Sequence, residues 1–268
     1  MNALAFVVIL RFKIMSKIAL ITGATAGIGE ACARLFAREG YQLILTGRRT
    51  TRLEELRGEL INRFQVNVQL LVFDVRNNAD VSTQLKSLSE EWQQVDVLIN
   101  NAGLSVGLDP INEGSIDDWD TMIDTNIKGL LYVSKIVSGW MVKRKHGHIV
   151  NLGSIAGKET YANGNVYCAT KHAVDSLNKA MRIDLLPYGI KVTGIHPGAV
   201  ETEFSEVRFK GDTERAKKVY EGFEPLRAED IAETIWFAVS RPAHVNINDL
   251  VIMPTAQAST SHLLRRNE

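Results

Sequence analysis

Three residues in the second half of the sequence, Ser154, Tyr167 and Lys171, are of types that together can exchange a proton with a carbonyl or hydroxyl oxygen. Tyr167 and Lys171 are four positions apart, so on a helix they lie on one face. An ammonium group favours a nearby phenolate, and we therefore expect Lys171 to lower the pKa of Tyr167 from its usual value of about 10. A tyrosine tuned in this way can act as a general acid or base, with Ser154 as a second donor to the same oxygen.

A glycine-rich segment near the N-terminus, TGATAGIG at 22–29, predicts a nucleotide site between a strand and a helix. Glycines let the backbone approach a pyrophosphate closely, and a helix N-terminus presents free N–H groups. The spacing is G-x-x-x-G-x-G rather than the common G-x-G-x-x-G, and the alternative is a simple tight turn. The residues that we expect to contact a cofactor here are Gly23, Thr25, Ala26, Gly27, Ile28 and Gly29.

The end of the second predicted strand, TGRR at 46–49, indicates which nicotinamide cofactor is bound. A carboxylate at this point binds a free ribose hydroxyl, whereas arginine accommodates a 2′-phosphate. Arg48 and Arg49 are present and no acidic residue follows before Glu54. We therefore predict NADP(H) rather than NAD(H); the alternative is an exposed basic turn.

Two further strand ends predict cofactor contacts. Asp74 and Val75 follow the third strand, where the Asp74 carboxylate can accept a hydrogen bond from an adenine amino group or simply cap the loop. Asn101, Ala102 and Gly103 follow the fourth strand, where small residues leave room for a cofactor. The carboxyl ends of parallel strands are where such sheets bind ligands.

Strand and helix patterns alternate along the chain, which predicts a parallel sheet covered on both faces. We predict an α/β fold: a single Rossmann-like, doubly wound domain over 16–268, with seven parallel strands. The strands are expected at 18–22, 41–46, 68–73, 95–100, 148–152, 191–195 and 250–253, and the helices at 28–39, 51–62, 79–92, 117–143, around Tyr167 to 186, and 228–240. The polar segment 200–225 lacks strand character and is expected to form a substrate lid.

Composition excludes several classes of protein. The chain has 268 residues, 45% of them hydrophobic, which suits one core. Its 31 basic and 31 acidic residues balance, so nothing favours nucleic acid or an anionic membrane as a partner. The two cysteines, Cys32 and Cys168, form no metal or disulfide pattern, and we expect no metal site and a reducing, cytoplasmic location.

The first 15 residues are expected to be an extension, disordered or loosely packed. The apolar run at 3–10 is too short to span a bilayer, and its positive charges follow the run instead of preceding it as in a signal peptide. The alternatives are an upstream start codon, with Met15 as the natural start, and a segment that touches a membrane.

The sequence resembles the short-chain dehydrogenase/reductase family over nearly the whole chain from Lys17 onward. The motifs that carry the resemblance are TGATAGIG at 22–29, NNAG at 100–103, Asn126, Ser154, YCATK at 167–171 and PG at 197–198. Within the family it is most similar to NADP-dependent 3-hydroxy acid dehydrogenases, including serine or allo-threonine and 3-hydroxypropionate dehydrogenases, through TGRR, MIDTNIKGL, GNVYCATK, EFSEVRFKGD and PAHVNIND. Relatives can carry extra glycines near Glu201, which this chain lacks.

The resemblance implies roles for individual residues. Tyr167 would exchange the proton, Lys171 would bind the nicotinamide ribose, Ser154 would orient the substrate oxygen and Asn126 would hold a relay water. The nicotinamide end would be lined by Pro197, Gly198, Val200 and Thr202. The resemblance also implies a homotetramer.

A hydroxy acid substrate requires a cation for its carboxylate, and Arg208, Lys210 and Lys158 are the candidates. We prefer Arg208, because a guanidinium can pair bidentately with a carboxylate; the alternative is an exposed charge. Cys168, His172 and His196 are expected to be structural. The sequence therefore predicts an NADP-dependent oxidoreductase of short 3-hydroxy acids, with a broad carbonyl or 3-oxoacyl reductase and a non-catalytic nucleotide-binding regulator as alternatives.

Overall fold

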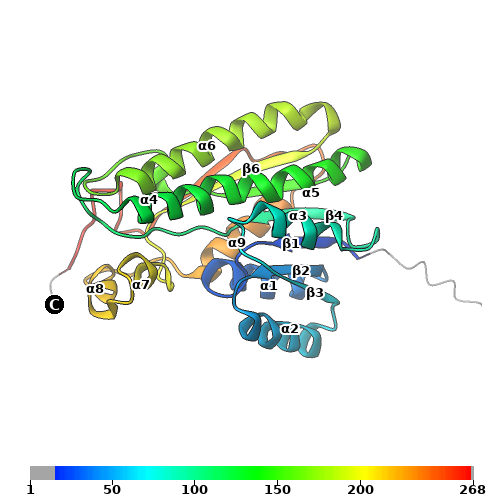
Figure 1. Cartoon of the computed structure of the whole chain (residues 1–268), viewed down its shortest axis with the longest axis horizontal. Helices are drawn as coiled ribbons and strands as arrows, with labels where there is room; N and C mark the ends of the chain where they lie inside the picture. The colour runs from blue at the N-terminus through cyan, green and yellow to red at the C-terminus, as the bar shows by residue number, and fades with distance from the viewer. Residues whose placement is uncertain (1–15, 267–268) are drawn as a thin grey trace, which may run out of the picture.

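A seven-stranded parallel sheet forms the centre of the protein, seen in a computed structural model that describes residues 16–266 (Figure 1). The strands run in the order β3-β2-β1-β4-β5-β6-β7, and every neighbouring pair is parallel. They are β1 (Ile18–Ile21), β2 (Gln42–Gly47), β3 (Val68–Val72), β4 (Val95–Asn100), β5 (His148–Leu152), β6 (Lys191–Pro197) and β7 (Asp249–Ile252). The predicted doubly wound architecture is confirmed, with the change of direction between β1 and β4.

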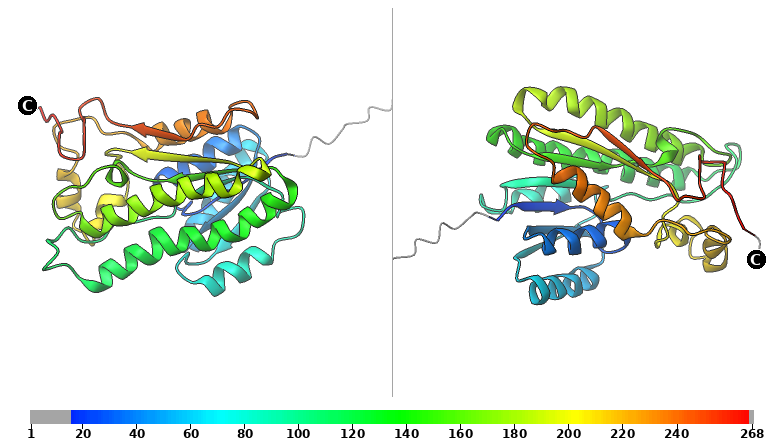
Figure 2. Two further views of the ribbon diagram at one scale, coloured as in Figure 1. Left: turned by 90° about the horizontal axis from the view of Figure 1, so that it is seen from above. Right: turned by 180° about the vertical axis from the view of Figure 1, so that it is seen from behind.

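Helices cover both faces of the sheet, as the views in Figure 2 show. Successive strand residues point to opposite faces. Ala19 and Ile21 of β1 therefore join the core beneath α1 (Gly27–Arg38), α2 (Thr50–Phe64) and α9 (Ala228–Val239). Ile18 and Leu20 face the opposite core, formed with α3 (Asn78–Lys86), α5 (Leu130–Arg144) and α6 (Asn165–Leu185).

Two predicted helices differ from the structure. The helix expected over 79–92 ends at Lys86, because the Ser87 hydroxyl donates to the Gln84 carbonyl and the following residues form turns. The helix expected over 117–143 is α4 (Ile116–Ile123) and α5 joined by a π-helical turn, Asp124–Gly129. Such turns often occur at functional sites, and this one contains Asn126.

The segment predicted as a lid contains two short helices, α7 (Phe204–Arg208) and α8 (Thr213–Lys218). They lie together at one end of the molecule, apart from the helices that cover the sheet (Figure 1). The ends of the segment meet where Val200 pairs with Leu226. The predicted extension at 1–15 lies outside the described residues, and within 16–266 no helix has the length and apolar character needed to cross a membrane.

Candidate active site

A cavity of about 350 Å³ opens at the carboxyl ends of the strands. Residues from the ends of β1 to β6 and from the lid line it together. Those that the sequence singled out are Gly23, Thr25, Ala26, Gly27, Ile28, Arg48, Arg49, Asp74, Val75, Asn101, Ala102, Gly103, Ser154, Tyr167, Lys171, Pro197, Gly198, Val200 and Thr202. Segments more than 170 residues apart in the chain thus share one cleft, because parallel strands end at the same edge of the sheet.

The glycine turn is packed too tightly for side chains at some positions. A Cβ on Gly29 would lie 2.4 Å from the Gly23 carbonyl oxygen, so Gly29 shapes the turn without lining the cavity. Gly27 has a φ of +53°, which favours glycine. The Thr22 hydroxyl accepts hydrogen bonds of 3.0 Å from the backbone N–H groups of Asn101 and Ala102, and so ties this turn to the end of β4.

The two arginines after β2 lie in different environments. The Arg48 side chain is 61% exposed, and among residues 16–266 its polar contact is with Asp74, at 3.5 Å. Arg49 donates to the Thr25 hydroxyl at 2.8 Å and pairs with Glu203 of the lid at 2.7 Å. Asp74 pairs more closely with Arg76, at 2.7 Å. Arg48 is thus the more available cation, and Arg49 connects the glycine turn with the lid.

Ser154, Tyr167 and Lys171 all line the cavity. Ser154 caps a short 3₁₀ helix, Ile155–Gly157, where its hydroxyl oxygen accepts from the Ala156 N–H at 3.1 Å. Tyr167 and Lys171 lie one turn apart on α6, and both are buried. The Lys171 ammonium donates to the Leu152 carbonyl oxygen at 2.8 Å.

The prediction that the pKa of Tyr167 is lowered is wrong for the protein without a bound cofactor. Burial raises the pKa of this phenol, while the nearby Arg208 guanidinium and a hydrogen bond with Ser154 act in the opposite direction. The Arg208 Cζ lies 5.2 Å from the centre of the Tyr167 ring. The cation that opposes the effect of burial thus comes from the lid rather than from α6.

Asn126 holds two parts of the site together but does not line the cavity. Its side chain accepts from the Leu104 N–H at 2.8 Å and donates to the Leu104 carbonyl at 2.8 Å and to the Thr170 hydroxyl at 3.0 Å. It therefore joins the loop after β4 to α6, next to Lys171. The π-helical turn directs the side chain to these partners.

The three candidate cations for a substrate carboxylate, Arg208, Lys210 and Lys158, differ in the groups that they already contact. Lys210 pairs with Asp118 at 2.9 Å, and Lys158 with Asp175 at 2.6 Å. Arg208 instead lies over aromatic rings, with its Cζ 5.1 Å from the centre of Phe204. Only Arg208 among these three has no carboxylate partner within residues 16–266.

Several site residues were not anticipated from the sequence. Phe204 lines the cavity with its ring centre 5.6 Å from that of Tyr167, and Glu203 lines it while pairing with Arg49. Tyr161 and Ser105 hold Arg208 in place. Glu203 and Phe204 begin the EFSEVRFKGD match, but nothing in that match indicates their contacts, because these contacts join segments far apart in the chain.

Replacing Lys171 with methionine is expected to stabilise the fold at neutral pH. Burial lowers the pKa of the Lys171 ammonium from 10.5 to about 8. Between pH 8 and pH 10.5 the unfolded chain binds more protons at this group than the folded chain does. The free energy of unfolding linked to Lys171 is therefore fully present above pH 10.5 and is lost as the pH falls through 8. Urea denaturation across this range should therefore show an advantage for Lys171→Met that shrinks as the pH rises. An advantage that does not change with pH would contradict the buried charge.

Comparisons with known proteins agree with this geometry. Residues 17–213 match the family described as short chain dehydrogenase. The chain is 49% identical over 242 residues to the NADP-dependent 3-hydroxy acid dehydrogenase YdfG of Escherichia coli (strain K12), covering 90% of this chain and 96% of that protein. It is 45% identical over 254 residues to sulfoacetaldehyde reductase 2 of Chromohalobacter salexigens, covering 94% and 100%. The closed form of serine dehydrogenase complexed with NADP⁺ is similar with a TM-score of 0.88 and 47% identity, covering 93% and 100%. This chain therefore belongs to the short-chain dehydrogenase family and is an oxidoreductase.

Proposed function

We propose that this enzyme transfers a hydride between NADP(H) and a short 3-hydroxy acid, such as L-serine, L-allo-threonine or 3-hydroxypropionate, or the corresponding keto acid or semialdehyde. The observation that carries the proposal is the guanidinium of Arg208, which belongs to the lid and lies beside the Tyr167 ring, next to the cavity residues Phe204 and Val207 although it does not itself line the cavity. A cation at this point suits a substrate with an anionic group close to its reacting carbon.

The residues of the cleft fit an NADP cofactor. The tight glycine turn and the start of α1 supply backbone N–H groups for a pyrophosphate, and Ala26, Gly27 and Ile28 line the cavity there. Arg48 lines the same cavity with an exposed guanidinium that suits a 2′-phosphate. The relatives are named as NADP-dependent, and solved neighbours contain NADP⁺ or NADPH. The enzyme is therefore NADP-dependent.

The orientation of Arg208 supports a role in binding an anion. Its Nε donates to the Ser105 hydroxyl at 3.2 Å and its Nη2 to the Tyr161 hydroxyl at 3.0 Å. Its Nη1 has no hydrogen-bond partner within residues 16–266. A 3-hydroxy acid places its carboxylate two bonds from the carbinol carbon, a short reach from Tyr167. Arg208 belongs to the segment 200–225, which we propose closes over the substrate.

Tyr167, Ser154 and Lys171 then perform the proton chemistry. A bound nicotinamide supplies or accepts the hydride. When the carbonyl is reduced, the hydroxyl groups of Ser154 and Tyr167 donate to the oxygen on which negative charge grows, and Tyr167 gives up its proton. When the alcohol is oxidised, the Tyr167 phenolate accepts the hydroxyl proton. Lys171, which lines the same cavity, binds the nicotinamide ribose, and Asn126 holds α6 against the loop after β4.

The names of the relatives also point to anionic substrates. A 3-hydroxy acid dehydrogenase and a serine dehydrogenase act on carboxylates, and a sulfoacetaldehyde reductase acts on a sulfonate. A broad carbonyl reductase or a 3-oxoacyl reductase is the alternative within the family. The presence of Ser154, Tyr167 and Lys171 in one cleft disfavours a non-catalytic regulator.

Arg208→Ala is expected to lower kcat/KM for 3-hydroxy acids by roughly 10- to 100-fold, mainly through KM, because a charge-assisted hydrogen bond is lost. The matched control is Lys210→Ala, which removes a neighbouring lid cation that already pairs with Asp118. Initial rates with serine, allo-threonine, 3-hydroxypropionate and sulfoacetaldehyde, beside a neutral ketone, measure the effect. An equal loss on the neutral ketone, or an unchanged KM for every acid, would reject the anion-binding role.

We also propose a homotetramer, as the family resemblance implies. Large apolar side chains are exposed at the end of α6 and on β7, including Ile183, Leu186 and Val251. Such side chains are often covered by a second subunit. The molar mass in solution, measured by light scattering, tests this assembly.

A further inference from the structure

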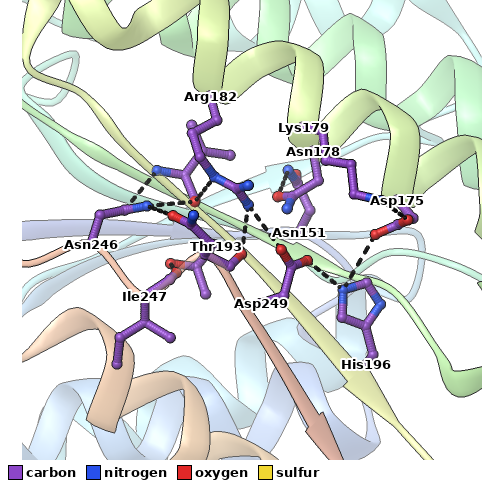
Figure 3. A network of polar contacts seen from close by, with 12 residues as sticks. Asn151, Asp175, Asn178, Lys179, Arg182, Thr193, His196, Asn246, Ile247 and Asp249 are labelled. Carbon is purple, nitrogen blue, oxygen red and sulfur yellow. Dashed lines mark hydrogen bonds and ion pairs between the residues drawn. The ribbon is translucent and has the colours of Figure 1, made fainter. Parts of the chain in front are cut away.

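A network of charged side chains joins α6, β6, β7 and the turn after Ser154. His196 Nε2 lies 3.0 Å from an oxygen of Asp249 and 3.7 Å from one of Asp175 (Figure 3). Lys158 Nζ lies 2.6 Å from that same Asp175 oxygen and 3.6 Å from the Asp249 oxygen. His196 is almost fully buried, with 1% of its surface exposed. We call Lys158, Asp175, His196 and Asp249 the Lys158 cluster.

The cluster is an ion-pair network rather than a metal site. Asp175, His196 and Asp249 are close enough together to bind a cation. The ammonium of Lys158 already takes the place of that cation, since it contacts both carboxylates. The outer carboxylate oxygens face Lys179 at 2.7 Å and Arg182 at 3.4 Å. Two negative groups thus meet three positive ones, which leaves no demand for a divalent ion.

Three members of the cluster, Lys158, Asp175 and His196, lie close in the chain to residues that line the cavity. Asp175 follows Lys171 by four residues on α6, and Lys158 follows Ser154 by four residues. His196 precedes Pro197, which lines the cavity at the end of β6. The cluster therefore joins three segments that place the serine, the tyrosine with its lysine, and the wall of the cavity.

The turn that carries Ser154 is closely packed between two of these segments. A Cβ added to Gly157 would lie 2.5 Å from the Lys171 carbonyl oxygen of α6. A Cβ added to Gly153 would lie 2.4 Å from Nδ1 of His196 on β6. The turn thus touches α6 at one end and β6 at the other, and a small shift of either would move Ser154.

We propose that Lys158 is a positioning residue for Ser154. Its ammonium fastens the turn to Asp175 on α6 and Asp249 on β7, and so holds the Ser154 hydroxyl in line with Tyr167. This inference rests on the catalytic roles proposed above. Lys158 is suited to the task because its partner Asp175 is buried, and a buried carboxylate that loses its cation is strongly destabilised.

The pKa of His196 depends on the charged groups of the Lys158 cluster, so it can be used to detect the loss of Lys158. Burial is the largest effect that lowers the pKa of His196, and the Lys158 ammonium lowers it further, whereas Asp249 and Asp175 raise it. The charged groups that face it are Asp175 from α6, Asp249 from β7 and Lys158 from the turn, with Lys179 and Arg182 behind the carboxylates. Without Lys158 the two carboxylates dominate, so His196 would take up a proton more readily.

The matched pair of variants is Lys158→Met and Lys179→Met. Both lysines pair with Asp175, at 2.6 and 2.7 Å, but only Lys158 is attached to the Ser154 turn. Lys158→Met is expected to lower kcat roughly 10- to 100-fold, as small misplacements of catalytic groups do, with KM for NADP⁺ nearly unchanged. Lys158→Arg should recover most of the rate, and Lys179→Met should remain close to wild type. NMR of the His196 imidazole should show its pKa raised in Lys158→Met.

A double-mutant cycle with Ser154→Ala tests the route of the effect, because residues that act as a unit are not additive. If Lys158 acts through Ser154, Lys158→Met should lower kcat only slightly further in a protein that already carries Ser154→Ala. Wild-type kcat in Lys158→Met, an equal loss in Lys179→Met, or a full additional loss in the Ser154→Ala background would each overturn the proposal. Wild-type kcat in Ser154→Ala alone would instead reject the catalytic role of Ser154, which is a separate failure.

Discussion

Tyr167→Phe is expected to lower kcat by roughly 10²- to 10⁴-fold, the usual contribution of a positioned acid or base, while NADPH binds almost as in the wild type. The substitution removes one hydroxyl and keeps the ring, whose centre lies 5.6 Å from that of Phe204. The packing of the site should therefore survive, and only the proton donor should be lost. Single-turnover kinetics and a fluorescence titration with NADPH measure the two quantities separately.

The control for Tyr167→Phe is Tyr188→Phe, which removes a hydroxyl from an exposed tyrosine away from the cavity. That variant should keep the wild-type rate. Turnover above about a tenth of wild type in Tyr167→Phe would show that another group moves the proton, since a general acid is worth at least about 10²-fold. Loss of NADPH binding together with turnover would show that the hydroxyl supports the site structurally.

Arg48→Ala is expected to raise KM for NADP⁺ roughly 10- to 100-fold, the range for a lost charge-assisted contact with phosphate, and to change KM for NAD⁺ only slightly. Arg48 is exposed at the cavity, and its one polar contact within residues 16–266 is with Asp74, at 3.5 Å. Arg49→Ala should weaken both cofactors, because Arg49 also joins Thr25 of the glycine turn to Glu203 of the lid. Steady-state kinetics with each cofactor distinguish these results.

Arg52→Ala is the control for the two arginines. Arg52 also pairs with Glu203, but it does not line the cavity. Its loss should leave the ratio of NADP⁺ to NAD⁺ efficiency unchanged. If Arg48→Ala weakened the two cofactors equally, the guanidinium would have no role in recognising the 2′-phosphate.

Much of the architecture could be predicted from local patterns. The apolar runs that became β1, β4 and β5 lie within a residue of the expected bounds, because a strand buried on both faces is almost continuously apolar. The end of α3 at Lys86 and the π-helical turn at Asn126 were missed. Both are local changes of helix geometry that leave the hydrophobic period almost unchanged, so the pattern of apolar residues does not reveal them.

The order of the strands and helices, and the motifs that follow each strand, can be predicted from sequence patterns alone. Since parallel strands end at one edge, these motifs had to meet there, and Gly23, Asn101, Ser154 and Lys171 do line one cavity. Which of the candidate cations can still bind a substrate carboxylate depends on how the whole chain packs. Lys158 pairs with Asp175 and Lys210 with Asp118, whereas Arg208 pairs with no carboxylate within residues 16–266.

The tertiary structure also decided the acidity of the catalytic groups. Spacing along a helix indicated that Lys171 would lower the pKa of Tyr167. In the structure, burial raises the pKa of Tyr167 and the nearby Arg208 lowers it, while burial lowers the pKa of Lys171. Sequence spacing defines which residues share a helix face. Desolvation and the approach of charges from distant segments depend on how the whole chain packs, and these forces set the chemistry of the site.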